Sequence, residues 1–314
     1  MDTFPNECIY TILLFLNPKC LQLCGQINNN FKELCQLGSL WRTQIENKYN
    51  VLFKKENNYE NCKLYYQLCT LKRKFKFIYE ADGLYKLPIL YKHDAGLNEL
   101  PKEVGQLINL VELYFSENKL SKLPGEIGKL INLNLLDLSC NKLIELPREI
   151  YQLTNLRCLD VSNNKLTQLR REIKQLTNLE YLDLSDNKLI QLPEEIGLLS
   201  KLIQLYLINN KLIEVTSEIV KLSNLVCLDI SNNKLTQLPE EIGLLSKLVR
   251  LGLNNNKLIQ IPSEITKLAK LKILNLENNL LTELPRGMNK LKLQQFYFSN
   301  NPINELQKKV KRID

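Results

Sequence analysis

Leucine side chains recur along most of the chain in one fixed pattern, Leu-x-x-Leu-x-Leu-x-x-Asn-x-Leu, which residues 179–189 illustrate. A short motif, Leu-Pro-x-x-Ile, follows most copies, as at 192–196. The asparagines of the pattern are 23 residues apart: they are Asn118, Asn141, Asn164, Asn187, Asn210, Asn233, Asn256 and Asn279. An imperfect first copy begins at Leu87, and a last copy runs from Leu293 to Asn301. Self-similarity at such a period predicts a repeat architecture.

The chemistry of each position predicts its structural role. In Leu-x-Leu, the two leucines point to one face of a short strand, and the residue between them points to the other face. Successive strands are expected to stack in parallel at about 4.8 Å. The Asn bends the chain, and its amide bonds backbone groups that would otherwise cost about 1–3 kcal/mol each if left unpaired. The pattern therefore predicts an α/β solenoid with a curved parallel sheet of about ten repeats over residues 87–314.

The proline of Leu-Pro-x-x-Ile marks the turn toward the opposite side of each coil. Its ring fixes the φ angle there, and the Ile and Leu that follow are expected to close the core from a helical or near-helical segment. Arg170 and Thr216 replace this proline in two repeats. Because neither residue fixes φ, looser turns are expected at these two positions.

The repeats resemble the leucine-rich-repeat family, in the 23-residue Leu-Pro-x-x-Ile class that is typical of intracellular scaffold-like proteins. The resemblance covers the chain from about Leu87 to Leu306. It implies a sheet on the concave side of the solenoid and a role in binding another protein along that face.

The outward positions of the strands supply the candidate site. The candidate partner-binding residues are Tyr114, Asp137, Asp160, Tyr181, Asp183, Tyr206, Ile208, Asp229, Arg250 and Tyr297. One interpretation is an acidic stripe with aromatic anchors for a basic, partly apolar partner, because interface hot spots favour Tyr and Arg. The other is that Asp-x-Ser is a common filler of such repeats, so that the tyrosines, Ile208 and Arg250 are the informative departures.

A column of lysines runs beside the repeated asparagines. Its members are Lys119, Lys142, Lys165, Lys188, Lys211, Lys234 and Lys257. The column is either a cationic rim that binds an acidic partner or a solvated face that keeps the sheet soluble. The sequence leaves both alternatives open.

Residues 1–86 do not follow the repeat, and their apolar residues recur at helical spacing. A small all-helical domain is expected over 1–48, followed by a helical linker or cap over 49–86. The order Phe-Pro-x-Glu from Phe4, Leu-x-Pro-x-x-Leu from Leu16 and Ser-Leu-Trp from Ser39 resembles the F-box motif. That resemblance implies docking to a Skp1-type adaptor through Pro5, Ile9, Ile12, Leu16, Leu21 and Trp41. The alternative is a helical cap that covers the apolar end of the solenoid.

An F-box followed by repeats implies the substrate-recognition subunit of a Skp1-cullin-F-box ubiquitin ligase. The concave face would hold an unidentified protein substrate, and the mechanism would be proximity, which raises the effective concentration of substrate at the ligase. The alternative is a scaffold or regulator of a signalling protein, for example a small GTPase, in which the N-terminal helices only cap the solenoid.

Charge and motif content argue against other classes of function. The net charge of +8 is modest, so neither nucleic acid nor a membrane surface is expected as a partner. No phosphate-binding glycine loop is present, and the single histidine, His93, has only Asp94 beside it, so an enzyme is not expected and no cofactor or metal is predicted. The nine cysteines form no Cys-x-x-Cys pair and no Asn-x-Ser/Thr sequon occurs, which favours an intracellular protein of the cytoplasm or nucleus. We expect the chain to be monomeric before it assembles with its partners.

Overall fold

The computed structural model describes residues 86–303, and contacts divide the chain into two units, Met1–Leu87 and Pro88–Asp314. The predicted helical domain over 1–48 and nearly all of the cap over 49–86 therefore lie outside the described residues. The same holds for the expected adaptor-binding residues Pro5, Ile9, Ile12, Leu16, Leu21 and Trp41. The second unit is described here by itself.

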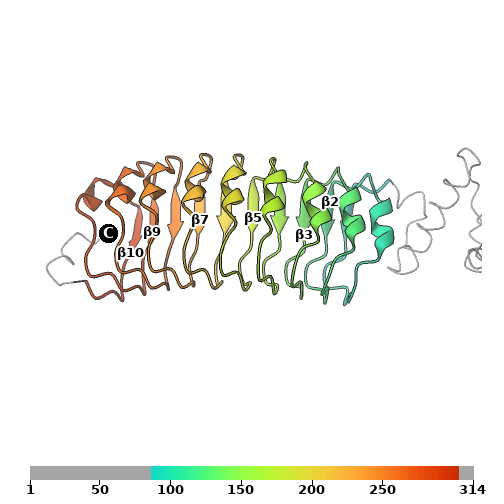
Figure 1. Ribbon diagram of the computed structural model, residues 1–314, viewed down its shortest axis with the longest axis horizontal. Coiled ribbons are helices and arrows are strands. Elements are labelled where there is room, and N and C mark those ends of the chain that lie inside the picture. Colours follow the sequence, from blue (N-terminus) through green and yellow to red (C-terminus); the bar gives the residue numbers. More distant parts are fainter. Residues whose placement is uncertain (1–85, 304–314) are drawn as a thin grey trace, which may run out of the picture. The chain divides into compact units, whose positions relative to one another are not determined.

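Residues 86–303 form a repeated coil in which every turn adds one strand to a single sheet (Figure 1). The ten strands pair in parallel in the order of the sequence. They are β1 Ile89–Tyr91, β2 Glu112–Tyr114, β3 Leu135–Asp137, β4 Cys158–Asp160, β5 Tyr181–Asp183, β6 Gln204–Tyr206, β7 Cys227–Asp229, β8 Arg250–Gly252, β9 Ile273–Asn275 and β10 Gln295–Tyr297. The predicted parallel sheet and its number of repeats are confirmed.

The leucine at the centre of β1 to β9, a position that Phe296 holds in β10, explains why the strands stack in register. Leu113 pairs with Leu90 on one side and Leu136 on the other, and its side chain is fully buried. The Leu-x-Leu alternation therefore sends leucines into the core and leaves the flanking strand residues on the open face. Burying each Leu stabilises the fold by roughly 1.5–3 kcal/mol. In the imperfect first copy, Leu90 keeps this register although Lys92 and Ala95 depart from the pattern.

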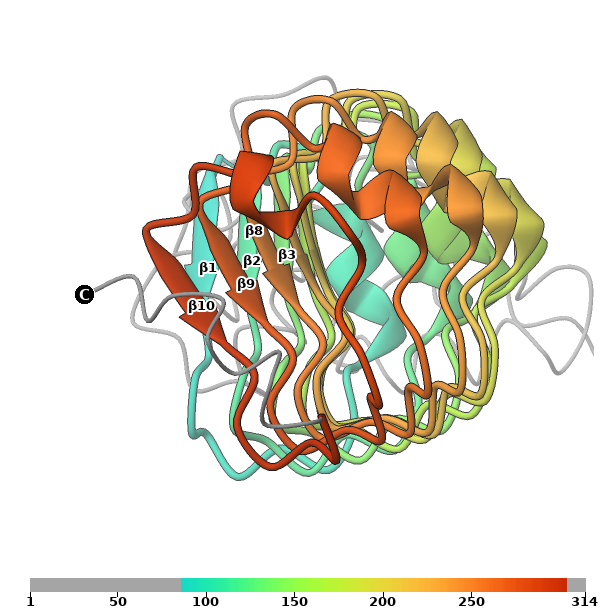
Figure 2. The same ribbon diagram turned by 90° about the vertical axis from the view of Figure 1, so that its left-hand side faces the viewer.

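Short 3₁₀-helices line the opposite side of the coil from the sheet (Figure 2). They are η1 Lys102–Gln106, η2 Gly125–Lys129, η3 Arg148–Gln152, η4 Arg171–Gln175, η5 Glu194–Leu198, η6 Ser217–Lys221, η7 Glu240–Leu244, η8 Ser263–Lys267 and η9 Met288–Lys290. In η5 the repeated Ile196 is fully buried and closes the core from this side. In Figure 2 the end strands β1 and β10 lie to the left of the middle strands, so the sheet face is concave.

The turns at Arg170 and Thr216 correct one prediction from the sequence, because they are not looser than the proline turns. Pro193 precedes its helix with φ −68° and ψ 147°. Arg170 has φ −78° and ψ 150°, and Thr216 has φ −57° and ψ 138°. Side chains replace the missing ring: the Thr216 hydroxyl accepts the Glu218 N–H, and the Arg170 guanidinium bonds Glu145 at 2.7 Å.

The repeated asparagines form the buried ladder that the sequence predicts. The Asn187 amide nitrogen donates to the carbonyl of Val161 in the preceding coil at 3.0 Å, and to the carbonyls of Leu184 and Ser185 in its own coil. Its side-chain oxygen accepts the N–H of Leu166 at 2.9 Å. Each such residue thus joins two coils and satisfies buried backbone groups. One residue earlier, every coil passes through a positive φ between 45° and 57°, a conformation that Asn adopts with little strain.

A second asparagine ladder lies just before the strands, and the sequence analysis missed it. The amide nitrogens of Asn132, Asn155, Asn178 and Asn224 donate to backbone carbonyls of the preceding coil at 2.7–2.8 Å. Lys201 and Lys247 occupy the same position in two other repeats, where each donates its ammonium to the Asn of the coil before it. The sequence offered a signal, Leu-x-Asn-Leu at the same 23-residue spacing, but Lys replaces this Asn in several of the later repeats.

Candidate partner-binding face

The concave face carries one row of side chains from the last residue of each strand, which we name the central row. Strand register places its members side by side: Tyr91, Tyr114, Asp137, Asp160, Asp183, Tyr206, Asp229, Gly252, Asn275 and Tyr297. The sequence did not identify Tyr91 as a member of this row, because the first repeat departs from the pattern. Strand pairing nevertheless aligns Tyr91 with Tyr114. The structure therefore brings the predicted outward residues together on one surface.

Two aromatic rings stack at the start of the central row. The ring centroids of Tyr91 and Tyr114 are 4.3 Å apart, with 7° between the ring planes. The Tyr114 hydroxyl donates to the Glu112 carboxylate at 2.9 Å. Burial raises the pKa of Tyr114, and hydrogen bonds with Glu112 and Tyr91 raise it further, so the phenol stays neutral. Tyr91 remains 62% exposed and offers an aromatic surface to a partner.

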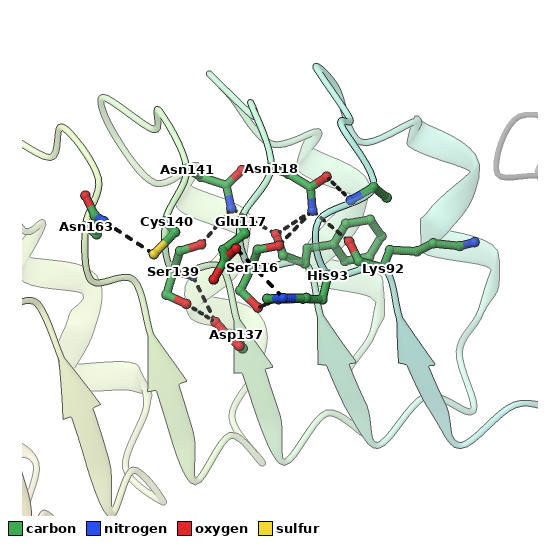
Figure 3. Close-up of polar contacts among 12 residues, drawn as sticks. Lys92, His93, Ser116, Glu117, Asn118, Asp137, Ser139, Cys140, Asn141 and Asn163 are labelled. Carbon is green, nitrogen blue, oxygen red and sulfur yellow. Dashed lines mark hydrogen bonds and ion pairs between the residues drawn. The ribbon is translucent and has the colours of Figure 1, made fainter.

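The only histidine of the chain, His93, follows β1 by two residues and lies beside Ser116 and Glu117 (Figure 3). His93 Nδ1 hydrogen-bonds the Ser116 hydroxyl at 3.0 Å, and His93 Nε2 lies 3.9 Å from the Glu117 carboxylate. His93 and Glu117 are both more than half exposed. Because both partners are open to solvent, this arrangement has the features of a polar surface contact.

Three adjacent carboxylates occupy the middle of the central row, and each also has a structural role. Asp137 and Asp160 accept both the N–H and the hydroxyl of the serine two residues later, at 2.7–2.9 Å, and Asp183 accepts the N–H of Ser185. Figure 3 shows this turn at Asp137 and Ser139. Burial raises the pKa of Asp160, and the charges of Asp183 and Asp137 add to that effect, while the bonds to Ser162 oppose it.

Asp229 is the least accessible member of the central row. Its residue is only 4% exposed, and its carboxylate accepts the Ser231 N–H at 3.1 Å and lies 3.5 Å from the Arg250 guanidinium. Gly252 beside it has no side chain, and an added Cβ would lie 2.4 Å from the Asp229 carboxylate. The Asp229 carboxylate therefore fills the space beside Gly252 and offers a partner little accessible surface, whereas the Arg250 side chain stays exposed.

A second aromatic pair follows the carboxylates. The rings of Tyr181 and Tyr206 are tilted by 48° with their centroids 5.6 Å apart. Burial raises the pKa of Tyr206 to about 12, with a hydrogen bond to Cys227 as the next cause. Ile208 is half-buried beside this pair, and its backbone N–H donates to the Ser185 hydroxyl at 3.3 Å. Aromatic and branched apolar side chains thus meet at one place on the face.

The last strand ends the face with a further aromatic group. Tyr297 is 43% exposed. Phe296 and Phe298 take the inward positions that leucines hold elsewhere, and their rings stack with centroids 4.8 Å apart. A shallow hollow of about 600 Å³ lies against these rings and is lined also by Glu277, Ser299 and Ile303.

The lysine column lies on the bends that follow the strands, and all seven side chains are exposed. The backbone N–H of each lysine donates to a leucine carbonyl of the preceding coil, as Lys188 does to Leu166 at 2.8 Å. Within residues 86–303 none of these ammonium groups forms an ion pair with a carboxylate. The column is a solvated cationic edge beside the concave face.

The described part of the chain holds no cluster of three or more His, Cys, Asp or Glu side chains arranged to bind a metal ion. Between residues 86 and 303, no helix has the length and apolar content needed to cross a membrane.

Comparison with known proteins agrees with this architecture. A family model described as a leucine-rich repeat region matches residues 98–180 and 164–248. None of the curated proteins compared with the chain matches it at a significant level. The chain belongs to the leucine-rich-repeat family, and its fold and open concave face define a protein-interaction module.

Several solved structures of the same fold are plant proteins. The plant peptide hormone receptor RGFR1, solved in complex with RGF2, is 34% identical over 65% of this chain and 34% of the receptor chain, with a TM-score of 0.59. The receptor kinase ectodomain GASSHO1/SCHENGEN3 from Arabidopsis thaliana, in complex with CASPARIAN STRIP INTEGRITY FACTOR 2, is 32% identical over 66% and 29%, with a TM-score of 0.56. A plant ice-binding protein is 30% identical over 65% and 68%, with a TM-score of 0.55. The chain spans about a third of the length of the two receptor chains.

Proposed function

We propose that the concave face of the repeats captures a protein partner, with the two tyrosine pairs and Tyr297 as anchors. The observation that carries this proposal is the exposure of aromatic rings on an open sheet, with Tyr91 62% and Tyr297 43% exposed. Rigid aromatic side chains supply contact area at low entropic cost and are enriched among binding hot spots. RGFR1 with RGF2 offers a precedent for peptide binding by this class of repeat.

The partner that fits this face is basic and partly apolar. Asp137, Asp160 and Asp183 lie next to one another in the central row, between Tyr114 and Tyr206. A Lys or Arg of the partner would meet their carboxylates, and its apolar residues would contact the rings of Tyr114 and Tyr206. Complementary charge of this kind sets orientation and the rate of association more than affinity.

We further propose that the whole chain is the substrate-recognition subunit of a Skp1-cullin-F-box ubiquitin ligase inside the cell. The support is the F-box-like order of motifs around Pro5, Leu16 and Trp41, which lies outside the described residues. The repeats would hold the substrate while other subunits perform the chemistry, so the chain itself needs no nucleophile and no cofactor. Its contribution is effective concentration.

An adaptor-binding assay tests this proposal. The full-length chain is expected to pull down a purified Skp1-type adaptor, and the double variant Pro5→Ala with Leu16→Ala is expected to lose it. A matched control, Asn28→Ala with Asn29→Ala, changes polar residues of the same segment and should retain the adaptor. If the unmodified chain does not bind, or the double variant binds equally well, the ubiquitin-ligase assignment is wrong. The chain is then a scaffold or regulator of a signalling protein, for which a small GTPase is the candidate partner.

A further inference from the structure

A groove of about 370 Å³ lies at the edge of the solenoid where the strands begin, outside the central row. We name it the rim groove, and its lining residues are Glu180, Lys201, Ile203, Asn224, Val226 and Lys247. Ile203 and Val226 directly precede β6 and β7 and form the apolar part of the lining. Ile203 is 37% exposed although it is a large apolar side chain, so it presents apolar surface to solvent.

The two lysines of the rim groove are held in place by the second asparagine ladder. Lys201 Nζ donates to Asn178 Oδ1 at 2.7 Å, and Lys247 Nζ donates to Asn224 Oδ1 at 2.6 Å. Those asparagines are themselves fixed, because Asn178 donates to the Thr154 carbonyl and Asn224 to the Ser200 carbonyl. An ammonium group has three N–H donors, so each lysine keeps donors for a ligand after its bond to Asn.

The charge of the rim groove is positive. Within residues 86–303, neither Lys201 nor Lys247 forms an ion pair. The one carboxylate of the lining, Glu180, lies 3.7 Å from the Arg157 guanidinium and is thereby offset. Two fixed cations beside an apolar surface therefore favour an acidic ligand that also carries apolar side chains.

We propose that the rim groove binds an extended, acidic and apolar segment of a partner protein. Lys201 and Lys247 occupy the same position two repeats apart, which corresponds to about 10 Å at the spacing of parallel strands. An extended chain in the polyproline II conformation has three residues per turn and rises about 3.1 Å per residue, so residues three positions apart lie on the same side, about 9 Å from each other. Two acidic residues three positions apart in this conformation would thus both face the lysines, and the apolar residues between them would lie toward the neighbouring Ile203 and Val226. This site is separate from the central row, and it stands whether or not the concave face captures a partner.

A methyl NMR titration of the full-length chain tests the proposal directly. The chain is labelled with ¹³C at Ile and Val methyl groups, and the probe is the capped peptide Gly-Glu-Leu-Val-Glu-Gly. The signals of Ile203 and Val226 are expected to shift and saturate, while those of the exposed residues Ile144 and Ile190 elsewhere on the surface stay in place. Raising the salt concentration should weaken the binding, because exposed ion pairs are screened.

Two charge variants locate the lysine contacts. Lys201→Glu with Lys247→Glu should weaken binding about tenfold, because two exposed ion pairs are replaced by repulsions. Lys201→Gln with Lys247→Gln keeps an N–H donor for the asparagines but removes the charge, and it should also weaken binding. The matched control, Lys188→Glu with Lys234→Glu in the lysine column, makes the same charge change elsewhere and should bind like the unmodified chain.

Four outcomes would overturn the proposal. One is the absence of any shift at Ile203 and Val226 with the acidic probe. Another is equal binding of a probe in which Lys replaces both Glu residues. A third is undiminished binding by both lysine variants. The last is a shift of the same signals on raising the protein concentration without probe, which would assign the rim groove to contact between two copies of this chain.

Discussion

The rings of Tyr91 and Tyr114 stack face to face on the concave sheet, with 4.3 Å between their centroids. The strand register that aligns Leu90 with Leu113 also aligns these two tyrosines, because each follows its leucine by one residue. The same regularity that builds the core therefore builds the surface. A partner would meet two rings already held in place rather than two independent side chains.

The titration of Tyr114 tests this aromatic pair. Burial is the main reason that the pKa of Tyr114 is raised. The stacked ring of Tyr91 shields the Tyr114 phenol from water, and Tyr91 also hydrogen-bonds it. We expect Tyr91→Ala to lower the pKa of Tyr114, because the neighbouring ring is removed and water reaches the phenol. The measurement is an alkaline titration followed by NMR of ¹³C-labelled tyrosine. The distant variant Tyr297→Ala should leave the titration of Tyr114 unchanged, and an unchanged curve in Tyr91→Ala would contradict the stacked arrangement.

Removal of one ladder asparagine is expected to cost much stability. Asn187→Ala leaves the buried N–H of Leu166 without its acceptor and removes three donated bonds to carbonyls. We expect a loss of about 2–4 kcal/mol in the free energy of unfolding, measured by urea denaturation. The control is Asn178→Ala in the second ladder, whose bond to Thr154 is solvent-exposed and whose loss should cost under about 1 kcal/mol. Equal costs for the two variants would refute the ladder's structural role.

Proline substitution is expected to have opposite effects at the two turns that lack it. Thr216 already has the φ and ψ of the proline turns, so Thr216→Pro should stabilise the fold by about 0.5 kcal/mol through reduced freedom of the unfolded chain. Arg170→Pro should destabilise it by about 1–3 kcal/mol, because the Arg170 backbone N–H bonds the buried Tyr151 hydroxyl. Thermal unfolding of both variants checks this pair, and a loss of stability in Thr216→Pro would contradict the observed geometry.

The pH dependence of stability should change when Asp160 becomes Asn. Because the pKa of Asp160 is raised in the folded state, the folded chain binds a proton there more readily than the unfolded chain. This contribution favours folding fully below the ordinary pKa of 3.8 and is lost as the pH rises through the folded-state pKa. Asp160→Asn removes this loss of stability at higher pH, because Asn does not ionise. It also keeps a side-chain oxygen that can accept the Ser162 N–H, as the Asn275 side chain accepts the Glu277 N–H at 3.0 Å.

At pH 7 the Asn variant should therefore be at least as stable as the unmodified chain, and its relative advantage should disappear below pH 3.8. Urea denaturation at several pH values measures both. Glu99→Gln, a change of the same charge at an exposed position, is measured beside it as the control for the altered net charge. A variant that is less stable at pH 7 than in acid, relative to the unmodified chain, would contradict the direction of the Asp160 shift.

The repeat core could be predicted from the sequence because one physical rule acts in every coil. Leu and Asn at fixed spacing leave a single way to bury the apolar side chains and to pair the backbone, so the strands, the ladder and the central row followed. The turns at Arg170 and Thr216 could not be judged from proline content. Their geometry is set by neighbouring coils and by side-chain bonds to Glu145 and Glu218.

The sequence predicted which residues lie on the concave face but not how accessible each side chain is to a partner. The register of Asp229 follows from the repeat, yet its burial depends on the missing side chain at Gly252 and on Arg250. Tyr91 escaped notice because its repeat departs from the pattern at Lys92 and Ala95. The rim groove depends on Lys replacing Asn at some positions of the second ladder, and the hydrogen bonds of that ladder do not follow from the repeat pattern.

Quantitative affinity capture from cells tests the role of the concave face most directly. The full-length chain is compared with a triple variant, Tyr114→Ala, Tyr206→Ala and Tyr297→Ala, and with Arg148→Ala, an exposed control on the 3₁₀-helix side. Both variants must first show the circular dichroism spectrum of the unmodified chain. We expect a defined set of proteins to be captured by the unmodified chain and the control but lost by the triple variant. Retention of the same proteins by a folded triple variant would contradict partner binding through this face.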